Sequence, residues 1–371
     1  MEKKGKLELT WVGKYEEEKL EPRILIEDKS KSYGDPDADN MLIHGDNLLA
    51  LKALENEYRG RIKCIYIDPP YNTGSAFEQY DDDLEHSIWL GIMKRRLEII
   101  RELLSDEGTL WISIDDDEGH YLKVVCDEVF GRANFINTVI WQKIHSIKND
   151  ARYLSENHDF ILVYSRNKDR VKFNLLPRTE AMNARYKNPD NDPRGPWQSG
   201  DLVANEERTN GYYDVVSPKT GKVFIVPKGK HWVYSQENMM KLIEDNGVWF
   251  GKDGNSFPRK KRFLADVMDG RKGDTWWTND EVGHNQEAKR ESIKLFGKTN
   301  AFATPKPERL IERIFQLATN EGDIVLDSFL GSATTTAVAH KMNRRWIGIE
   351  MGEHVVSHCK FRMDLVIDGE D

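Results

Sequence analysis

The sequence predicts an α/β fold in which a mostly parallel sheet carries helices on both faces. Two stretches of the 371-residue chain, 41–114 and 304–350, alternate short β-rich runs with amphipathic helices, as β-α-β units do. Between about 145 and 300 this alternation is lost, and glycine, proline and scattered aromatic residues take its place. We therefore expect an α/β domain that is interrupted by a loop-rich insertion.

The first stretch begins after a polar segment, 1–40, which we expect to be a lead-in with little core. Gly108 is expected to end a long amphipathic helix before the last strand of this stretch. The predicted strand, helix, strand, helix and strand are, in order, 41–44, 47–54, 62–67, 84–104 and 109–114.

The second stretch opens with Pro305-Lys306-Pro307-Glu308, and proline is favoured in the first turn of a helix. Gly322 lies just beyond the last apolar position of that helix, where a helix commonly ends. A strand, a turn, a helix and a strand then follow as one β-α-β unit, at 324–326, 327–332, 336–339 and 346–349.

Charge is distributed unevenly along the chain. The formal net charge is −9, but residues 145–300 hold 27 Lys and Arg against 22 Asp and Glu. A nucleic-acid-binding protein needs a basic surface where it meets the duplex, and its average charge can still be acidic. The negative total therefore does not exclude DNA as a partner.

The composition is that of a folded protein with 32% charged and 39% hydrophobic residues. No run approaches the roughly 18 apolar residues that a membrane span needs, so we expect no membrane partner. The cysteines Cys64, Cys126 and Cys359 form no C-x-x-C pair, and the histidines show no ligand spacing. We therefore expect no metal, no disulfide framework and a reducing, cytoplasmic location.

The tetrapeptide Asp68-Pro69-Pro70-Tyr71 directly follows the predicted buried strand 62–67. Ligands of parallel α/β sheets bind outside the carboxyl ends of the strands, which is where it lies. The Asp68 carboxylate and a proline-restrained carbonyl can together accept hydrogen bonds from both N–H groups of an amino group. Tyr71 offers a flat face for a stacked base. A proline-capped strand end with a solvated aspartate is the alternative interpretation.

A second candidate element is the turn 327–332, between a strand and a helix, where a backbone bend can hold a nucleotide-like cofactor. Its sequence is neither a phosphate-binding P-loop nor G-x-G-x-x-G. Glu350 ends the next strand, as ribose-binding acids do in dinucleotide folds. An ordinary tight turn and a solvated acid are the alternatives.

Taken together, these elements resemble the DNA amino-methyltransferases of the permuted (beta) class, in which the catalytic motif precedes the cofactor motif. In their details they most resemble the modification subunits of type III restriction–modification systems. The resemblance covers about 41–165 and 302–351. Its motifs follow one another in this order: 68–74; Trp89, Met93 and 96–97; Gly108 and 112–116; 157–164; 306–309; and 327–332.

The resemblance implies a Rossmann-like, doubly wound S-adenosylmethionine-dependent fold with circularly permuted motif order. It implies the following organisation: lead-in 1–40, catalytic half 41–144, target-recognition insertion 145–300 and cofactor-binding half 301–371. The implied catalytic residues are Asp68, Pro69, Pro70 and Tyr71. The implied cofactor-binding residues are Asp46, Lys306, Asp327, Phe329, Gly331, Ser332 and Glu350.

The implied reaction is methyl transfer from S-adenosylmethionine to adenine N6 in double-stranded DNA. The implied partners include a restriction subunit and a second copy of the chain. Asp68, rather than a serine, favours adenine. The second hypothesis is the same fold acting on cytosine N4, RNA or a protein side-chain amide, and the third is a DNA-recognition subunit that needs a partner for activity. The chain differs from many relatives in having Ala333 where they carry glycine, and type III subunits are usually longer.

DNA contact is expected in the insertion 145–300. A basic run could bind phosphates, and Trp276-Trp277 with Arg271-Lys272 could add groove or stacking contacts. The alternatives are a solvated loop for the basic run and core positions for the tryptophans. The residues of the run are Arg259, Lys260, Lys261 and Arg262.

Overall fold

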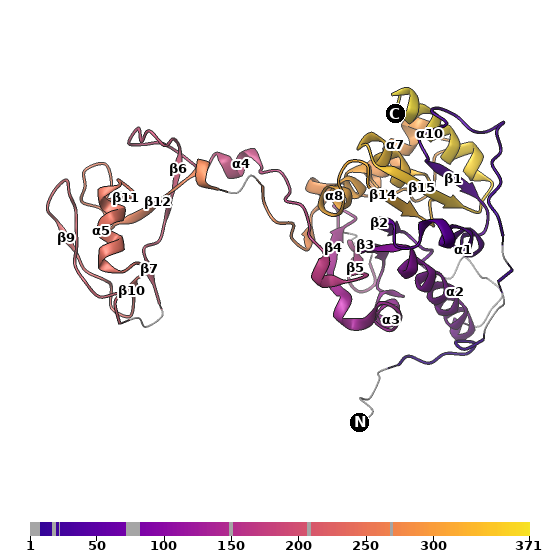
Figure 1. Cartoon of the computed structure of the whole chain (residues 1–371), viewed down its shortest axis with the longest axis horizontal. Coiled ribbons are helices and arrows are strands. Elements are labelled where there is room, and N and C mark those ends of the chain that lie inside the picture. Colours follow the sequence, from indigo (N-terminus) through magenta and orange to yellow (C-terminus); the bar gives the residue numbers. More distant parts are fainter. Residues whose placement is uncertain are drawn as a thin grey trace. The chain divides into compact units, whose positions relative to one another are not determined.

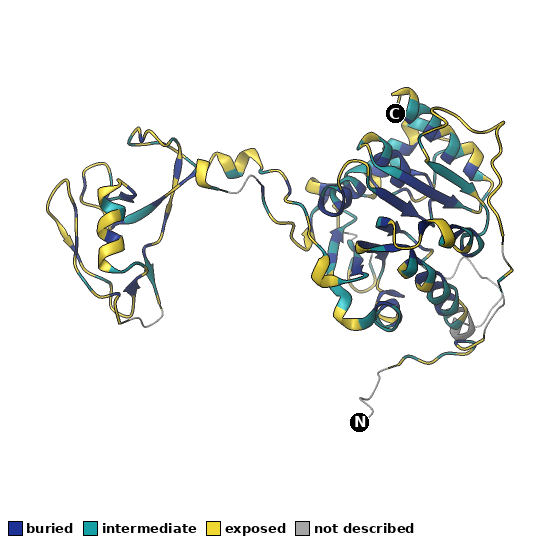
Figure 2. Ribbon diagram, in the orientation of Figure 1, coloured by how far each residue is buried: buried dark blue, intermediate teal, exposed yellow. Residues whose placement is uncertain are grey.

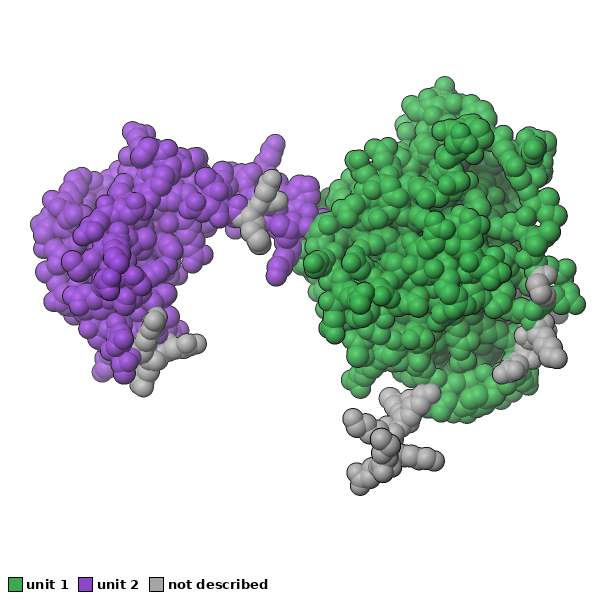
Figure 3. Space-filling model, in the orientation of Figure 1, with its two compact units in different colours: residues 1–174, 273–371 green, residues 175–272 purple. Residues whose placement is uncertain are grey.

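The computed structural model describes residues 8–16, 20–21, 23–71, 82–147, 151–205, 209–267 and 270–371. It divides into two compact units, which Figure 3 colours separately. Unit 1 consists of 1–174 and 273–371, and unit 2 consists of 175–272.

Unit 1 is built on an eight-stranded sheet with strands from both ends of the chain (Figure 1). Its order is β1 (Met41–His44), β15 (Arg345–Glu350), β14 (Ile324–Asp327), β2 (Ile62–Ile67), β3 (Leu104–Ile114), β5 (His158–Ser165), β4 (Phe135–Gln142) and β13 (Trp276–Trp277). The first five strands are mutually parallel, and β5 runs antiparallel to both of its neighbours. The C-terminal strands β14 and β15 thus lie between β1 and β2, as permuted motif order requires.

Helices cover both faces of this sheet, which confirms the predicted doubly wound α/β fold. Ile65 and Ile67 of β2 join one apolar cluster with the first group of helices, whereas Cys64 and Tyr66 point to the opposite face. Burial on both faces explains why β2 is almost continuously apolar (Figure 2). The first group is α1 (Asn47–Tyr58), α2 (Asp82–Leu103) and α3 (Gly119–Cys126); the second is α8 (Glu308–Ala318), α9 (Thr334–Lys341) and α10 (Phe361–Asp368).

The expected helix break at Gly108 is wrong. The helix α2 ends at Leu103, and Gly108 lies inside β3. A side chain at this position would bring its Cβ within 2.8 Å of the Ile62 carbonyl oxygen on β2. Glycine is therefore needed for the close approach of two strands, where the ladder between β2 and β3 is irregular.

Unit 2 contains three small antiparallel sheets around a separate apolar cluster that includes Trp232, Met239 and Phe250. Its elements are α4 (Glu180–Asn183), β6 (Trp197–Gly200), β7 (Val203–Ala204), β8 (Val215–Val216), β9 (Val223–Phe224), β10 (His231–Trp232), α5 (Gln236–Glu244), β11 (Val248–Trp249) and β12 (Arg259–Phe263). The pairings are β11-β12-β6, β10-β7 and β8-β9.

Unit 2 is shorter than the predicted insertion 145–300. The strands β5 and β13 and the helices α6 (Asn279–Val282) and α7 (Asn285–Phe296) belong to unit 1. Among the described helices, none is long and apolar enough to cross a bilayer.

Candidate active site

Asp68 lies at the carboxyl end of β2, beside β14, with which β2 pairs through Val325 and Leu326. The Asp68 Oδ2 atom forms an ion pair with the Nζ of Lys306, at 2.5 Å, although the two residues are 238 positions apart. Both side chains are largely buried, with 22% and 11% of their surfaces exposed. The strand end and the segment before α8 therefore meet at this edge of the sheet.

The second carboxylate oxygen of Asp68, Oδ1, is buried and has no hydrogen-bond partner within the described part of the chain. Buried acceptors are normally satisfied, because an unpaired one costs about 1–3 kcal/mol. The carbonyl of Pro70 accepts a hydrogen bond from Trp89 Nε1, at 2.8 Å. This bond holds the tetrapeptide backbone against α2. Asp68 therefore presents one restrained oxygen and one open acceptor.

Tyr71 is partly buried beside these groups. Burial raises the pKa of Tyr71 well above its usual value, so the phenol stays protonated. Its hydroxyl donates a long bond of 3.4 Å to Asp159 Oδ2, and the Lys306 ammonium lies 5.1 Å from the ring centroid. Asp159 is itself buried and accepts a hydrogen bond from Lys143, at 2.6 Å.

Asp159 and Lys143 were not among the predicted site residues. Asp159 is buried within β5, and a single acid inside an apolar run gives no local signal of its partners. Burial raises the pKa of Asp159, whereas the adjacent Lys143 ammonium acts to lower it. Asn72, Thr73 and Gly74, which continue the tetrapeptide motif, lie outside the described residues.

Asp327 ends β14 and begins the predicted cofactor turn. Its Oδ1 accepts a hydrogen bond from the Phe329 N–H, at 2.9 Å, and burial raises the pKa of Asp327 to about 7. The neighbouring Ser328 hydroxyl is buried without a hydrogen-bond partner among the described residues. Gly331 and Ala333 both have left-handed backbone conformations, with φ of +57° and +61°.

Glu350 connects this turn to the end of β15. Its Oε2 accepts a hydrogen bond from the Gly331 N–H, at 2.8 Å, and its Oε1 accepts bonds from the N–H groups of Met351 and Gly352. A carboxylate offers about four acceptor positions. Glu350 therefore holds the turn in place and keeps acceptor capacity for a ligand.

Asp46 is brought to the same edge by the parallel pairing of His44 with Glu350. Asp46 caps the N-terminus of α1 and contacts Arg96, whose Nη2 lies 3.3 Å from Asp46 Oδ2. The next residue, Asn47, donates a hydrogen bond to the Ser328 carbonyl, at 2.7 Å. Asn47 was not predicted as a site residue, and only the strand order reveals that it supports the turn.

The predicted catalytic and cofactor residues thus share one edge of the unit 1 sheet, whereas the predicted basic run lies on β12 of unit 2. Lys261 is a correction to that run: its side chain is fully buried and paired with Asp190 and Asp192. Its ammonium cannot reach a phosphate without breaking these ion pairs. Arg262 is exposed, and Arg259 and Lys260 are partly exposed.

The tryptophan pair divides between two environments. Trp277 is fully buried and stacks on Trp111, with ring centroids 6.0 Å apart, so it is a core residue of unit 1. Trp276 is 59% exposed. Alternation along β13 explains the difference, because successive side chains of a strand point to opposite faces.

The amino-acid sequence matches a family of known proteins. The model of a family described as DNA methylase matches residues 62–361. The chain is 34% identical to a probable type III restriction–modification enzyme HindVI Mod subunit from Haemophilus influenzae, over 92% of this chain and 52% of that protein. It is 34% identical to the StyLTI Mod subunit from Salmonella typhimurium, over 82% and 50%. It is 31% identical to the type II methyltransferase M.EcaI from Enterobacter cloacae, over 90% and 73%. The chain therefore spans about half the length of the two Mod subunits.

Proposed function

Because this chain belongs to the DNA methylase family, we propose that it methylates the N6 amino group of adenine in double-stranded DNA. The observation that carries the proposal is the open Oδ1 acceptor of Asp68, buried at the carboxyl edge of the sheet. An exocyclic amino group is a donor of the kind that such an acceptor lacks.

The amino nitrogen of adenine is a poor nucleophile because its lone pair is delocalised into the ring. Asp68 Oδ1 and the Pro69 carbonyl would each accept a hydrogen bond from one N–H of the amino group. These two bonds would favour a more tetrahedral, electron-rich nitrogen. The Lys306 ammonium restrains the other oxygen of Asp68, so Oδ1 is already oriented when the base arrives. Positioning of this kind contributes to rate without a cysteine nucleophile or a metal.

Tyr71 supplies the surface for a base that has rotated out of the duplex. Its hydroxyl contacts Asp159, which is paired with Lys143, and the raised pKa of Tyr71 keeps the phenol uncharged at neutral pH. Stacking requires the flat ring and not the hydroxyl, and the hydroxyl makes only a long bond here.

The cofactor of the proposed reaction is S-adenosylmethionine, which supplies an electrophilic methyl group when bound. The turn fits such a ligand because it combines left-handed backbone at Gly331 with an unpartnered Ser328 hydroxyl. Glu350 would accept from ribose hydroxyls, and Asp46 would lie near the adenine. Lys306 would face the methionine end, and Asp327, Phe329, Gly331 and Ser332 would line the pocket.

We assign DNA recognition to unit 2, with Arg259, Lys260 and Arg262 as candidate contacts. Two of the similar proteins are named as Mod subunits of restriction–modification enzymes. By analogy, a restriction subunit and a second copy of this chain are the proposed partners. Aspartate at position 68 favours adenine over cytosine N4.

The test is transfer of a tritiated methyl group from S-adenosylmethionine to mixed-sequence duplex DNA, followed by analysis of the nucleosides. N6-methyladenine is the expected product. N4-methylcytosine would change the base and leave the mechanism, whereas no methylated base from the chain alone would favour a recognition subunit that depends on a partner.

A further inference from the structure

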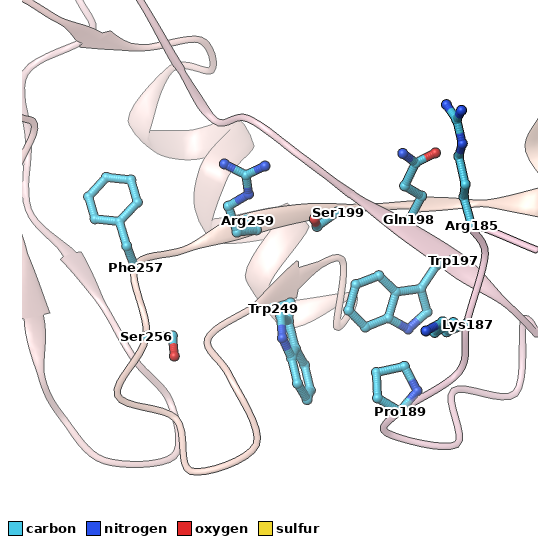
Figure 4. A pocket seen from close by; sticks show the side chains of 10 residues that line it. All are labelled: Arg185, Lys187, Pro189, Trp197, Gln198, Ser199, Trp249, Ser256, Phe257 and Arg259. Carbon is cyan, nitrogen blue, oxygen red and sulfur yellow. The ribbon is translucent and has the colours of Figure 1, made fainter.

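Unit 2 contains an open groove that the sequence did not reveal (Figure 4). Aromatic side chains and cations line it together: Trp197, Trp249, Phe257, Arg185, Lys187 and Arg259. The rings of Trp197 and Trp249 lie 5.4 Å apart, and Phe257 is 37% exposed. We call this surface the aromatic groove.

The cations of the aromatic groove differ in how free they are. Arg259 forms an ion pair with Asp201. Arg185 and Lys187 are exposed, and neither side chain has an ion pair with any residue that the structure describes. None of the described residues that line the groove is acidic. The positive charge of Arg185 and Lys187 is therefore uncompensated on this surface.

The wall that carries Lys187 is held by buried charges behind it. Lys187 exchanges two backbone hydrogen bonds with Trp197, at 3.0 and 2.8 Å, and the Trp197 indole donates to Asp190, at 2.9 Å. Lys261 then joins Asp190 to the buried Asp192. Buried Lys261 therefore stabilises the segment that carries Lys187, whereas the exposed Arg185 and Lys187 are available to bind a ligand.

We propose that the aromatic groove binds the backbone of duplex DNA, with Arg185 and Lys187 at phosphates. This inference rests on the proposed function. Phosphate contacts from exposed cations hold a protein on the duplex. Trp249 and Phe257 would supply apolar contacts to sugars and thymine methyl groups, and the exposed Gln198 amide on β6 would reach a base edge.

Uncompensated cations favour a polyanion over an apolar peptide or a second copy of this chain. Unit 2 holds 17 Lys and Arg against 13 Asp and Glu, in a chain with a net charge of −9. Two copies that met through their aromatic grooves would bring like charges together, whereas the phosphates of DNA carry the opposite charge.

The experiment measures binding of the full-length chain to a labelled mixed-sequence duplex by fluorescence anisotropy across a salt series. The association constant K decreases with salt, so a plot of log K against log salt has a negative slope. In the double variant Arg185→Ala/Lys187→Ala, this slope should become shallower by about 0.9 for each phosphate that the protein no longer neutralises. The matched control, Lys228→Ala/Lys230→Ala, removes the same charge from exposed positions of unit 2 outside the groove. Its slope should stay at the wild-type value.

A third variant, Trp249→Ala, should weaken binding several-fold at an unchanged slope, because an apolar contact releases no counterions. Trp249→Phe should recover most of the affinity. A thermal unfolding midpoint of Trp249→Ala close to that of the wild type separates an effect on DNA binding from an effect on folding, because Trp249 also packs against Trp197. Equal slope changes in the double variant and its control would overturn the proposal, as would no change in either. A shift in oligomeric state of the groove variants, seen by sedimentation with DNA binding intact, would instead make the groove an interface between copies.

The wild-type chain separates this inference from the function on which it rests. If the wild type neither binds duplex DNA nor methylates it, the proposed function fails and the groove proposal fails with it. If the wild type does both and the groove variants behave like wild type, only the groove proposal fails.

Discussion

The carboxyl edge of the unit 1 sheet and the surface of unit 2 use charge in opposite ways. At the sheet edge, acids are buried and shared: Asp68 with Lys306, Asp159 with Lys143, and Glu350 with backbone N–H groups. In unit 2, Lys261 is buried, whereas Arg185 and Lys187 remain exposed. Burial holds a charge in one geometry, as chemistry requires, whereas exposure leaves it free to meet a partner. The position of a charged residue along the chain does not show whether its side chain is buried or exposed.

The largest effect is expected at Asp68. Asp68→Ala removes the open acceptor, and methyl transfer should fall by at least about 10³-fold, while cofactor and DNA binding change little. The control Asp106→Ala removes an exposed carboxylate of the neighbouring strand β3, away from its carboxyl end, and should leave the rate unchanged. Single-turnover rates measure both. An Asp68→Ala protein that transfers methyl groups at near the wild-type rate would remove the mechanism.

Lys261 tests whether unit 2 depends on buried charge as the sheet edge does. Lys261→Ala leaves the buried Asp192 carboxylate with fewer partners, so the free energy of unfolding should fall by about 3 kcal/mol. Arg262→Ala, at the exposed neighbouring position, should change it by less than about 0.5 kcal/mol. Denaturant unfolding followed by tryptophan fluorescence compares the two. If both variants lowered the free energy of unfolding equally, burial would not explain the difference between Lys261 and Arg262.

Tyr71 tests what the site requires from its aromatic ring. Tyr71→Ala should lower kcat/KM by about 10- to 100-fold because the stacking surface is removed. Tyr71→Phe keeps the ring and gives up only the 3.4 Å bond to Asp159, so it should retain most of the activity. Steady-state kinetics on one duplex compare them. A Phe variant as impaired as the Ala variant would assign the role to the hydroxyl.

Asp327 tests the cost of burying an acid at the sheet edge. The pKa of Asp327 is raised from 3.8 to about 7 by burial, so the folded protein keeps a proton that the unfolded chain loses. Stability should therefore fall as pH rises from about 4 to 7 and stay lower above that range. Asp327→Asn cannot ionise and should be more stable than wild type at pH 8, by about 1 to 2 kcal/mol, with the difference shrinking towards pH 4. Thermal unfolding at both pH values measures this, and a pH-independent difference would contradict it.

The smallest effect is expected at Ala333, where the turn meets α9. Ala333 has φ of +61°, which favours glycine, but its methyl group is fully buried. Ala333→Gly would relieve the strained backbone and remove the buried methyl group, so the free energy of unfolding should change by no more than about 1 kcal/mol. Calorimetric unfolding with and without S-adenosylmethionine measures it. A large loss of stability would show that packing, and not the turn conformation, dominates here.

Local pattern alone predicted the five mutually parallel strands of unit 1, whereas β5 and β13 fell within the predicted insertion. The strands at Met41–His44 and Ile62–Ile67 were predicted with the bounds that the structure has. Period-two and period-3.6 apolar spacing follow directly from which faces are buried, so they can be read without partners. The rule that ligands bind at carboxyl strand ends likewise indicated Asp68, Asp327 and Glu350 without knowledge of the strand order.

Only the tertiary structure decided which of these side chains meet. The pairing of Lys306 with Asp68 and of Asn47 with Ser328 depends on β14 lying beside β2 and β15 beside β1. In unit 2, the basic run and the aromatic groove come from short strands whose register no local pattern specifies. The burial of Lys261 is set there by pairing across three strands. The local spacing of apolar residues indicates which face of a helix or strand is buried. Contacts between residues far apart in the chain depend instead on strand order and register, which are determined only by the whole fold.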